Sequence, residues 1–158
     1  MLVSEAMTKN PLTCSPDAPL RDAVAILREH HIGGLPVVDG DTLVGIVTES
    51  DVIAQLRTWK LSDDLWLPSP LEVIEIPVRE YINWEKTKHA LVNIGDTPVK
   101  KVMSHPVITG TVDMDIEAAA ALMLTRKIAR LPITDGKKLV GILTRADIVQ
   151  AVGKSYSS

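Results

Sequence analysis

Residues 32–53 read IGGLPVVDGDTLVGIVTESDVI, and residues 128–149 read IARLPITDGKKLVGILTRADIV. The two stretches align without a gap at an offset of 96 residues, and the alignment extends over residues 3–55 and 99–151. A fixed offset over so long a stretch indicates two copies of one supersecondary unit. We call these copies motif 1 and motif 2.

The pattern within each motif predicts the order β-α-β-β-α. For motif 1 the expected elements are an extended segment near 12–14, a helix over 17–30, strands over 35–38 and 43–48, and a helix over about 49–57. Ser15-Pro16 resembles an N-cap followed by a proline at the first helical position. Asp39-Gly40 between two aliphatic runs is a strong signal for a hairpin turn.

Apolar residues at helical spacing predict the face of the first helix that enters the core of each motif. These residues are Leu20, Ala23, Val24 and Leu27 in motif 1, and Ile116, Ala119, Ala120 and Met123 in motif 2. A unit of this size cannot bury its apolar sheet face alone. We therefore expect an α/β fold in which the two motifs pack sheet to sheet with pseudo-twofold symmetry. Ligand pockets favour junctions between such units, and here two equivalent clefts are expected.

Composition excludes several classes of protein. The chain has 158 residues, of which 46% are hydrophobic and 23% charged, with a net charge of -3. This balance argues against a nucleic-acid-binding surface as the main purpose. No apolar run approaches the roughly 18 residues that a membrane-spanning helix needs, and the N-terminus lacks the pattern of a signal peptide. With Cys14 as the only cysteine, no intrachain disulfide can form, and we expect a cytoplasmic protein.

Catalysis finds little support in the sequence. His30 and His31 lie near the end of the first helix, where a cation is favoured in any case, and motif 2 has Arg126 and Lys127 there. Cys14 has no adjacent basic residue to activate its thiol. The chain has no glycine-rich dinucleotide fingerprint, no P-loop and no nucleophile elbow. We expect neither an enzyme nor a metal site.

The recurring chemical feature is a Thr-x-x-Asp sequence where a strand becomes a helix, at Thr48–Asp51 and Thr144–Asp147. The unpaired N–H groups of a helix start suit an anion, and a carboxylate beside them can accept two hydrogen bonds from a sugar diol. The same sequence also resembles a capping box, which requires no ligand. Both roles can coexist at one helix start.

These residues resemble a known family. The run from Gly33 to Asp51 and its copy in motif 2 are similar to the CBS motif, named after cystathionine β-synthase, and Ala6-Met7-Thr8 and Val102-Met103-Ser104 resemble its opening. The resemblance implies a tandem pair called a Bateman module, with motif 1 in residues 1–57, an inserted linker in 58–97 and motif 2 in 98–158. It further implies a disc-shaped homodimer that binds an adenosine-containing ligand and regulates a partner protein. No obligatory cofactor is implied.

The family pattern also implies which residues line the ligand clefts. Ribose and phosphate are expected near Thr48, Ser50, Asp51, Thr144, Arg145, Ala146 and Asp147. An apolar slot for adenine is expected from Ile32, Gly33, Ile46, Ile128, Ala129 and Ile142, closed by Met7, Leu12, Met103 and Ile108. Gly34, Pro36 and Pro132 are also expected among the ligand-binding residues.

The two motifs differ at the position before Leu-Pro, where a basic residue in this family reaches phosphate. Motif 2 has Arg130 there, and motif 1 has Gly34. Arg145 of motif 2 likewise corresponds to Glu49 of motif 1. We expect the cleft of motif 2 to prefer a phosphorylated adenosine, and the cleft of motif 1 to be empty, to bind more weakly or to take a less anionic ligand. Asp147→Ala should then remove more AMP binding than Asp51→Ala. The alternative for Arg130 is a surface or interface salt bridge.

The insertion between the motifs has a character of its own. Val73–Ile76 has β character beside Pro68, Pro70 and Pro77, and residues 85–94 predict a short helix ended by Gly95. It serves either as a lid that packs on the disc or as an interaction surface. The second possibility rests on its aromatic residues, which are Trp59, Trp66, Tyr81 and Trp84.

Three functions compete. The first is a sensor of AMP, ADP or ATP that regulates an unidentified partner protein in trans, without a membrane or nucleic acid. The second is a dimerisation module whose clefts are degenerate, and a variant of the first senses S-adenosylmethionine or an NAD-type ligand instead. The third, an enzyme, lacks any matching group of residues.

Overall fold

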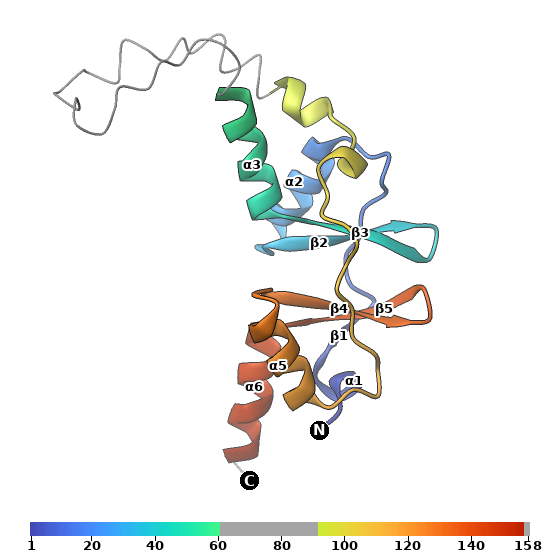
Figure 1. The fold of residues 1–158 in the computed structure, drawn as a ribbon, viewed down its shortest axis with the longest axis vertical. Coiled ribbons are helices and arrows are strands. Elements are labelled where there is room, and N and C mark those ends of the chain that lie inside the picture. Colours follow the sequence, from blue (N-terminus) through green and yellow to red (C-terminus); the bar gives the residue numbers. More distant parts are fainter. Residues whose placement is uncertain (61–91, 157–158) are drawn as a thin grey trace, which may run out of the picture.

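The computed structural model describes residues 1–60 and 92–156, and both motifs fall within this part of the chain (Figure 1). Motif 1 and the residues before it contain α1 (Val3–Ala6), β1 (Thr8–Lys9), α2 (Leu20–Glu29), β2 (Gly34–Asp39), β3 (Thr42–Thr48) and α3 (Glu49–Lys60). Motif 2 contains the 3-10 turn η2 (Val99–Lys101), α5 (Ile116–Thr125), β4 (Arg130–Asp135), β5 (Lys138–Thr144) and α6 (Arg145–Tyr156).

Each motif is built around one hairpin. In motif 1, Asp39 pairs with Thr42, and Gly40 adopts φ 61° in the two-residue loop between them. Gly136 adopts the same angle in motif 2. A positive φ at the first loop residue matches the right-handed twist of the two strands, and glycine adopts it without steric cost. The hairpin predicted at Asp39-Gly40 is therefore confirmed in both copies.

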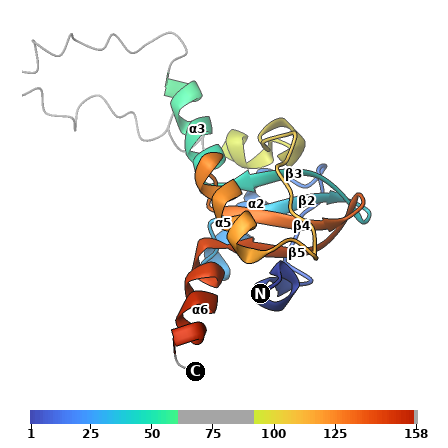
Figure 2. The ribbon, with the colours of Figure 1, turned by 60° about the horizontal axis from the view of Figure 1, so that its bottom comes forward.

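The two hairpins lie one above the other, with helices on their outer sides. Figure 1 shows α2 and α3 on the outer side of β2–β3, and α5 and α6 on the outer side of β4–β5, and Figure 2 shows the same layers from a second direction. The strands form one antiparallel sheet of order β1-β5-β3-β2, with β4 paired to β5. The two hairpins are hydrogen-bonded to each other only at their tips, where Thr42 pairs with Lys138. The predicted α/β fold with two stacked motifs is confirmed.

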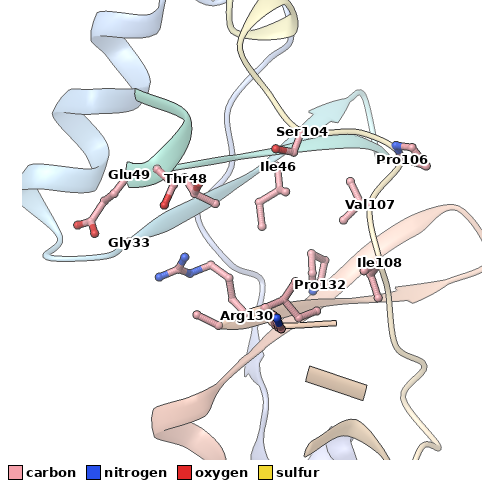
Figure 3. Close-up of a pocket in the computed structure, with 14 residues that line it drawn as sticks. Gly33, Ile46, Thr48, Glu49, Ser104, Pro106, Val107, Ile108, Arg130 and Pro132 are labelled. Atoms are coloured by element: carbon pink, nitrogen blue, oxygen red, sulfur yellow. The ribbon is translucent and has the colours of Figure 1, made fainter. Parts of the chain in front are cut away.

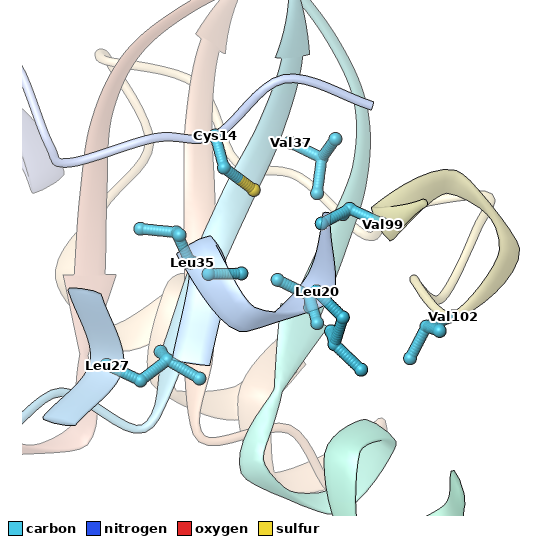
Figure 4. Packing of buried hydrophobic residues seen from close by; sticks show 9 residues of the cluster. Cys14, Leu20, Leu27, Leu35, Val37, Val99 and Val102 are labelled. Atoms are coloured by element: carbon cyan, nitrogen blue, oxygen red, sulfur yellow. The ribbon is translucent and has the colours of Figure 1, made fainter. Parts of the chain in front are cut away.

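Two hydrophobic cores hold the layers together, and they are built from equivalent positions. The core of motif 1 includes Leu20, Leu27, Leu35 and Val37 (Figure 4). The core of motif 2 uses the residues 96 positions later, including Met123, Leu131 and Ile133. Burial of one such aliphatic side chain stabilises the fold by about 1.5–3 kcal/mol.

The start of each motif packs against the other motif. Val99 belongs to the core of motif 1, and Val3 belongs to the core of motif 2; both side chains are fully buried. Backbone hydrogen bonds also cross between the motifs in this way. Val99 N donates to Ala18 O at 2.8 Å, and Val3 N donates to Met114 O at 2.8 Å. β1 is likewise paired with β5 of motif 2. The first residues of each motif in the sequence therefore pack in the core of the other motif. This exchange was not predicted from the sequence.

The first helix begins later than predicted. Ser15 does not cap it: the Ser15 hydroxyl accepts a hydrogen bond from the backbone N–H of Asp17 at 3.4 Å and closes a turn instead. The helix begins at Leu20, whose N–H donates to Thr97 O at 2.8 Å. Leu20, Ala23 and Leu27 face the core as predicted, but Val24 is 36% exposed.

In motif 2 the predicted core face is nearly complete, since Ile116, Ala119 and Met123 are buried while Ala120 is half-buried. The segment near 12–14 is extended, and Cys14 forms a parallel bridge with Val37.

The predictions for the insertion fall mostly outside the described residues. This applies to the β segment at 73–76 and to most of the helix expected over 85–94. The part that is described is helical over 92–96, so Gly95 does not end this helix.

Candidate functional site

A cavity of about 360 Å³ lies between the two hairpins (Figure 3). Motif 1 contributes the start of β2, the middle of β3 and the start of α3. Motif 2 contributes the segment after η2 and the start of β4. The lining residues are Gly33, Ile46, Thr48, Glu49, Ser50, Ser104, Pro106, Val107, Ile108, Lys127, Ile128, Ala129, Arg130 and Pro132.

The helix start of α3 presents a carboxylate beside this cavity. Asp51 Oδ2 accepts hydrogen bonds from the Thr48 backbone N–H at 2.8 Å and from the Thr48 hydroxyl at 3.0 Å. The Asp51 N–H donates to Thr48 Oγ1 at 3.3 Å. These reciprocal bonds are a capping box, and Thr144 and Asp147 repeat them in motif 2. The capping role considered from the sequence is therefore present at both sites.

The second oxygen of the carboxylate distinguishes the two aspartates. Asp51 Oδ1 accepts a hydrogen bond from Ser104 Oγ at 2.9 Å, and Ser104 lines the cavity. Asp51 is thus held at the edge of the cavity by motif 2 as well as by its own helix. Because Asp51 Oδ1 already accepts a hydrogen bond from a hydroxyl group, it can accept one from a ligand hydroxyl in the same place.

Arg130 crosses from motif 2 to the backbone of motif 1. Its Cζ lies 3.2 Å from the point where a Cβ atom of Gly33 would be, and its Nε lies 2.9 Å from the corresponding point of Gly34. A side chain at either glycine would collide with the guanidinium. The lack of a side chain at Gly33 and Gly34 therefore leaves the space that Arg130 of motif 2 occupies.

Burial lowers the pKa of Arg130, while the carboxylate of Glu49 raises it and the guanidinium of Arg145 lowers it. Arg130 forms no ion pair at salt-bridge distance within the described residues, so the salt bridge considered from the sequence is not observed there. A half-buried guanidinium that no carboxylate pairs at salt-bridge distance can bind a further anion.

The opposite end of the cavity is apolar. Ile46 faces it from β3, while Ile108 and Pro132 face it from motif 2 (Figure 3). Aliphatic side chains on two sides form a slot of the kind that accepts a flat ring.

The structure divides the predicted site residues differently from the sequence analysis. The predicted residues that line the cavity are Gly33, Ile46, Thr48, Ser50, Ile108, Ile128, Ala129, Arg130 and Pro132. Those that do not are Met7, Leu12, Ile32, Gly34, Pro36, Asp51, Met103, Ile142, Thr144, Arg145, Ala146 and Asp147. Two of these still touch the site, because Asp51 bonds to Ser104 and Gly34 lies against Arg130.

The cavity contains Arg130 without Asp147, although the sequence places both residues in motif 2. The cavity joins Arg130 to the helix start of motif 1, at Thr48 and Ser50. The reason is the stacking of the hairpins: the side chain of Arg130 leaves β4 toward the facing motif, on the side where Gly33 and Glu49 lie (Figure 3).

Met7 and Met103 were expected to close an adenine slot. They pack instead on glycines of the facing strands: Met103 Cγ lies 2.9 Å from the Cβ position of Gly45, and Met7 Cγ lies 3.1 Å from that of Gly141. Leu12 is 44% exposed and Pro36 is fully buried.

Five lining residues were not predicted, namely Glu49, Ser104, Pro106, Val107 and Lys127. Ser104 follows Met103 in the opening of motif 2 and corresponds to Thr8, so its place in the repeat was a usable signal. Lys127, at φ 55°, occupies the turn between α5 and β4, which corresponds to His31 at φ 51°. The sequence pattern indicated only a cation favoured at the end of the helix.

Cys14 and the potential metal ligands can be assessed within the described residues. Burial raises the pKa of the Cys14 thiol to about 11, which keeps it protonated and inert. No cluster of histidine, cysteine and carboxylate side chains with metal-binding geometry occurs within 1–60 and 92–156. In the same part of the chain, no helix has the length and apolar character to cross a membrane.

Comparison with known proteins agrees with this architecture. The model of the CBS domain family matches residues 3–58 and 99–154. Protein MJ1426 of Methanocaldococcus jannaschii is 38% identical over 154 residues, which cover 96% of this chain and 91% of the relative.

Two solved structures that are similar in fold carry ligands. CBSX2, a protein of Arabidopsis thaliana, in complex with AMP is 26% identical, with a TM-score of 0.71 over 98% of both chains. The CBS domain pair of protein MJ0100, in complex with 5′-methylthioadenosine and S-adenosyl-L-methionine, is 25% identical, again with a TM-score of 0.71 over 98% of both chains.

Proposed function

Since the chain belongs to the CBS domain family and carries two such domains in tandem, we propose that it is a regulatory module that binds one adenosine-containing ligand between its motifs. The observation that carries this proposal is one cavity that combines an apolar slot with a half-buried guanidinium and has a fixed carboxylate at its edge. These three features match the base, the sugar and the phosphate of a nucleotide.

The adenine ring is assigned to the slot between Ile46, Ile108 and Pro132, where its two faces meet aliphatic side chains. The ribose diol is assigned to Asp51, which accepts hydrogen bonds from both hydroxyls in place of the one from Ser104. A phosphate is assigned to Arg130, assisted by Lys127, because charge-assisted hydrogen bonds are about twice as strong as neutral ones.

The solved relatives support the class of ligand. One binds AMP and another binds 5′-methylthioadenosine and S-adenosyl-L-methionine. All three ligands share the adenosine group and differ in what is attached to its 5′ carbon. Adenine and ribose are thus the common part of the recognition, and the 5′ substituent is where members of the family differ.

Regulation is proposed to act in trans, through a cytosolic homodimer that binds a partner protein. The support for the dimer is a repeated apolar surface on the outer helices. Ile53 on α3 and Val149 on α6 are equivalent positions, and they are 57% and 71% exposed. Two copies of the chain that meet through these helices cover both patches at once, as a twofold interface requires.

The test compares Asp51→Ala with Asp147→Ala by isothermal titration of AMP. Both variants lose the same capping box, so both are expected to lose about 1 kcal/mol of stability. Only Asp51→Ala removes an acceptor at the cavity, and we expect it to bind AMP at least about tenfold more weakly, the effect of one lost hydrogen bond to a charged group. Asp147→Ala should bind AMP as the unmodified protein does.

A larger loss of AMP affinity in Asp147→Ala than in Asp51→Ala would contradict the assignment of the ribose to Asp51. Absence of binding of AMP, ATP, 5′-methylthioadenosine and S-adenosylmethionine to the unmodified protein would favour a dimerisation module with degenerate clefts.

A further inference from the structure

Glu49 places a negative charge in the same cavity that holds Arg130. It is the first residue of α3, its side chain is exposed, and it lines the cavity beside Thr48 and Ser50. A carboxylate at this position is unexpected in a cavity for anions, because it opposes a phosphate. In motif 2 the equivalent residue is Arg145, so an arginine also suits this position in the fold.

Glu49 and Arg130 approach the same point of the backbone from opposite motifs. The Cβ position of Gly33 lies 3.5 Å from Glu49 Oε2 and 3.2 Å from Arg130 Cζ. Figure 3 shows the guanidinium of Arg130 directed toward the side of the cavity where Glu49 and Gly33 lie. The backbone fixes this arrangement, because Glu49 N donates to Gly33 O at 3.1 Å.

The electrostatic environment of Arg130 is consistent with such a pair. Burial lowers the pKa of Arg130, and Glu49 is the group that raises it. Glu49 therefore offsets part of the cost of holding the guanidinium out of water. It does so without forming a tight salt bridge, so that the guanidinium stays available to a ligand.

We propose that Glu49 is the residue that sets the charge selectivity of this cavity: it balances Arg130 in the empty state and disfavours ligands that carry several phosphate groups. The proposal rests on the proposed function, since it concerns which adenosine compound binds between the motifs. It makes AMP and compounds with an uncharged or cationic 5′ group the preferred class over ATP.

The sign of the effect follows from the charge at the 5′ end. The repulsion from Glu49 grows with the negative charge of the ligand, vanishes for 5′-methylthioadenosine, and becomes an attraction for the sulfonium and ammonium groups of S-adenosylmethionine. Removing the charge of Glu49 should therefore change the affinities for ATP and AMP in one direction and the affinity for S-adenosylmethionine in the other. A nonspecific change in the shape of the cavity would not give opposite signs for these ligands.

The experiment measures the dissociation constants of ATP, AMP, 5′-methylthioadenosine and S-adenosylmethionine for the unmodified protein, Glu49→Gln and Glu49→Arg. For Glu49→Gln we expect about tenfold tighter binding of ATP and about threefold tighter binding of AMP at low salt. The affinity for 5′-methylthioadenosine should stay constant and that for S-adenosylmethionine should fall. Glu49→Arg, which copies Arg145, should enlarge each change in the same direction.

The matched control is Glu117→Gln, which removes the same charge from an exposed position in the first turn of α5, outside the cavity. It should leave all four constants unchanged. If Glu49→Gln changes the four affinities equally or not at all, the role of Glu49 is overturned while the proposed function stands. If the unmodified protein binds none of the four, both proposals fail together.

Discussion

At the scale of single residues, the two motifs are complementary and not identical. Motif 1 has Gly33 and Gly34 where motif 2 has Ala129 and Arg130. The glycines leave the space that the Arg130 side chain occupies. With Arg130 in its present position, any side chain at Gly33 or Gly34 would displace the guanidinium.

This complementarity predicts the effect of Gly34→Ala. A Cβ atom at this position lies 2.9 Å from Arg130 Nε and 3.0 Å from Nη1, so the guanidinium must move. Because the long, flexible side chain of Arg130 can swing aside, we expect the melting temperature to change little. AMP affinity should fall about tenfold, the loss of one charge-assisted contact. Calorimetric titration of AMP measures it.

The control is the same substitution in an Arg130→Ala background. If Gly34 acts only through Arg130, then Gly34→Ala has no further effect on AMP binding once the arginine is gone. An undiminished loss in that background would show that Gly34 contributes in another way.

The residue scale also marks the limit of what the sequence can predict. The resemblance to the CBS motif implied that Arg130, Thr48 and Ser50 face a ligand, because each matches a position of the family pattern. It could not show that Arg130 faces Thr48 and not Thr144, because that depends on how the two copies stack. The proximity of Glu49 to Arg130 could not be predicted for the same reason, since the two residues belong to different motifs.

At the scale of helices and strands, local sequence signals predicted the type of each element better than the residue at which it begins. The hairpins follow directly from Asp-Gly between aliphatic runs, and both are present with the predicted turn. The start of α2 was misplaced because its first N–H is satisfied by Thr97, a distant residue, and not by the nearby Ser15. The exchange of α1 and η2 between motifs has no local signal at all.

The packing of each motif start in the other motif predicts that two equivalent valines affect different motifs. Val3→Ala and Val99→Ala each remove two methyl groups from a fully buried side chain, at a cost of about 2 kcal/mol. Val3 packs in the core of motif 2, so Val3→Ala should reduce hydrogen-exchange protection mainly in α5 and β4. Val99→Ala should reduce it mainly in α2 and β2.

Native-state hydrogen exchange with peptide resolution separates the two variants, and chemical denaturation gives the total loss of stability. Each variant serves as the control of the other. Loss of protection in the motif that contains the substituted residue in the sequence would contradict the exchange.

At the scale of the whole molecule, the outer helices carry apolar surface with no partner within the described residues. The exposed side chains are Val24, Ile53 and Leu56 on motif 1, and Leu124, Val149 and Val152 on motif 2. A groove of about 400 Å³ between α2 and α3 continues this surface. Apolar patches of this kind mark interaction sites, and their repetition suits a second copy of the chain.

The dimer is tested with Val149→Glu, at a position outside the ligand cavity. A carboxylate in the centre of an apolar interface cannot be desolvated without a partner, so we expect the protein to become monomeric. Light scattering after size exclusion gives the mass. Val112→Glu, at an exposed loop position, is the control and should remain dimeric. A monomeric unmodified protein would remove the dimer from the proposal.

The exchange of the motif starts also bears on how the chain folds during synthesis. When residues 1–60 have left the ribosome, the core of motif 1 still lacks Val99, and Val3 has no core to enter. The N-terminal segment must therefore wait until α5 and β5 have been translated, and neither half can be completed first. A protein that looks in sequence like two successive domains folds as one cooperative unit, because long-range contacts close both cores only at the end.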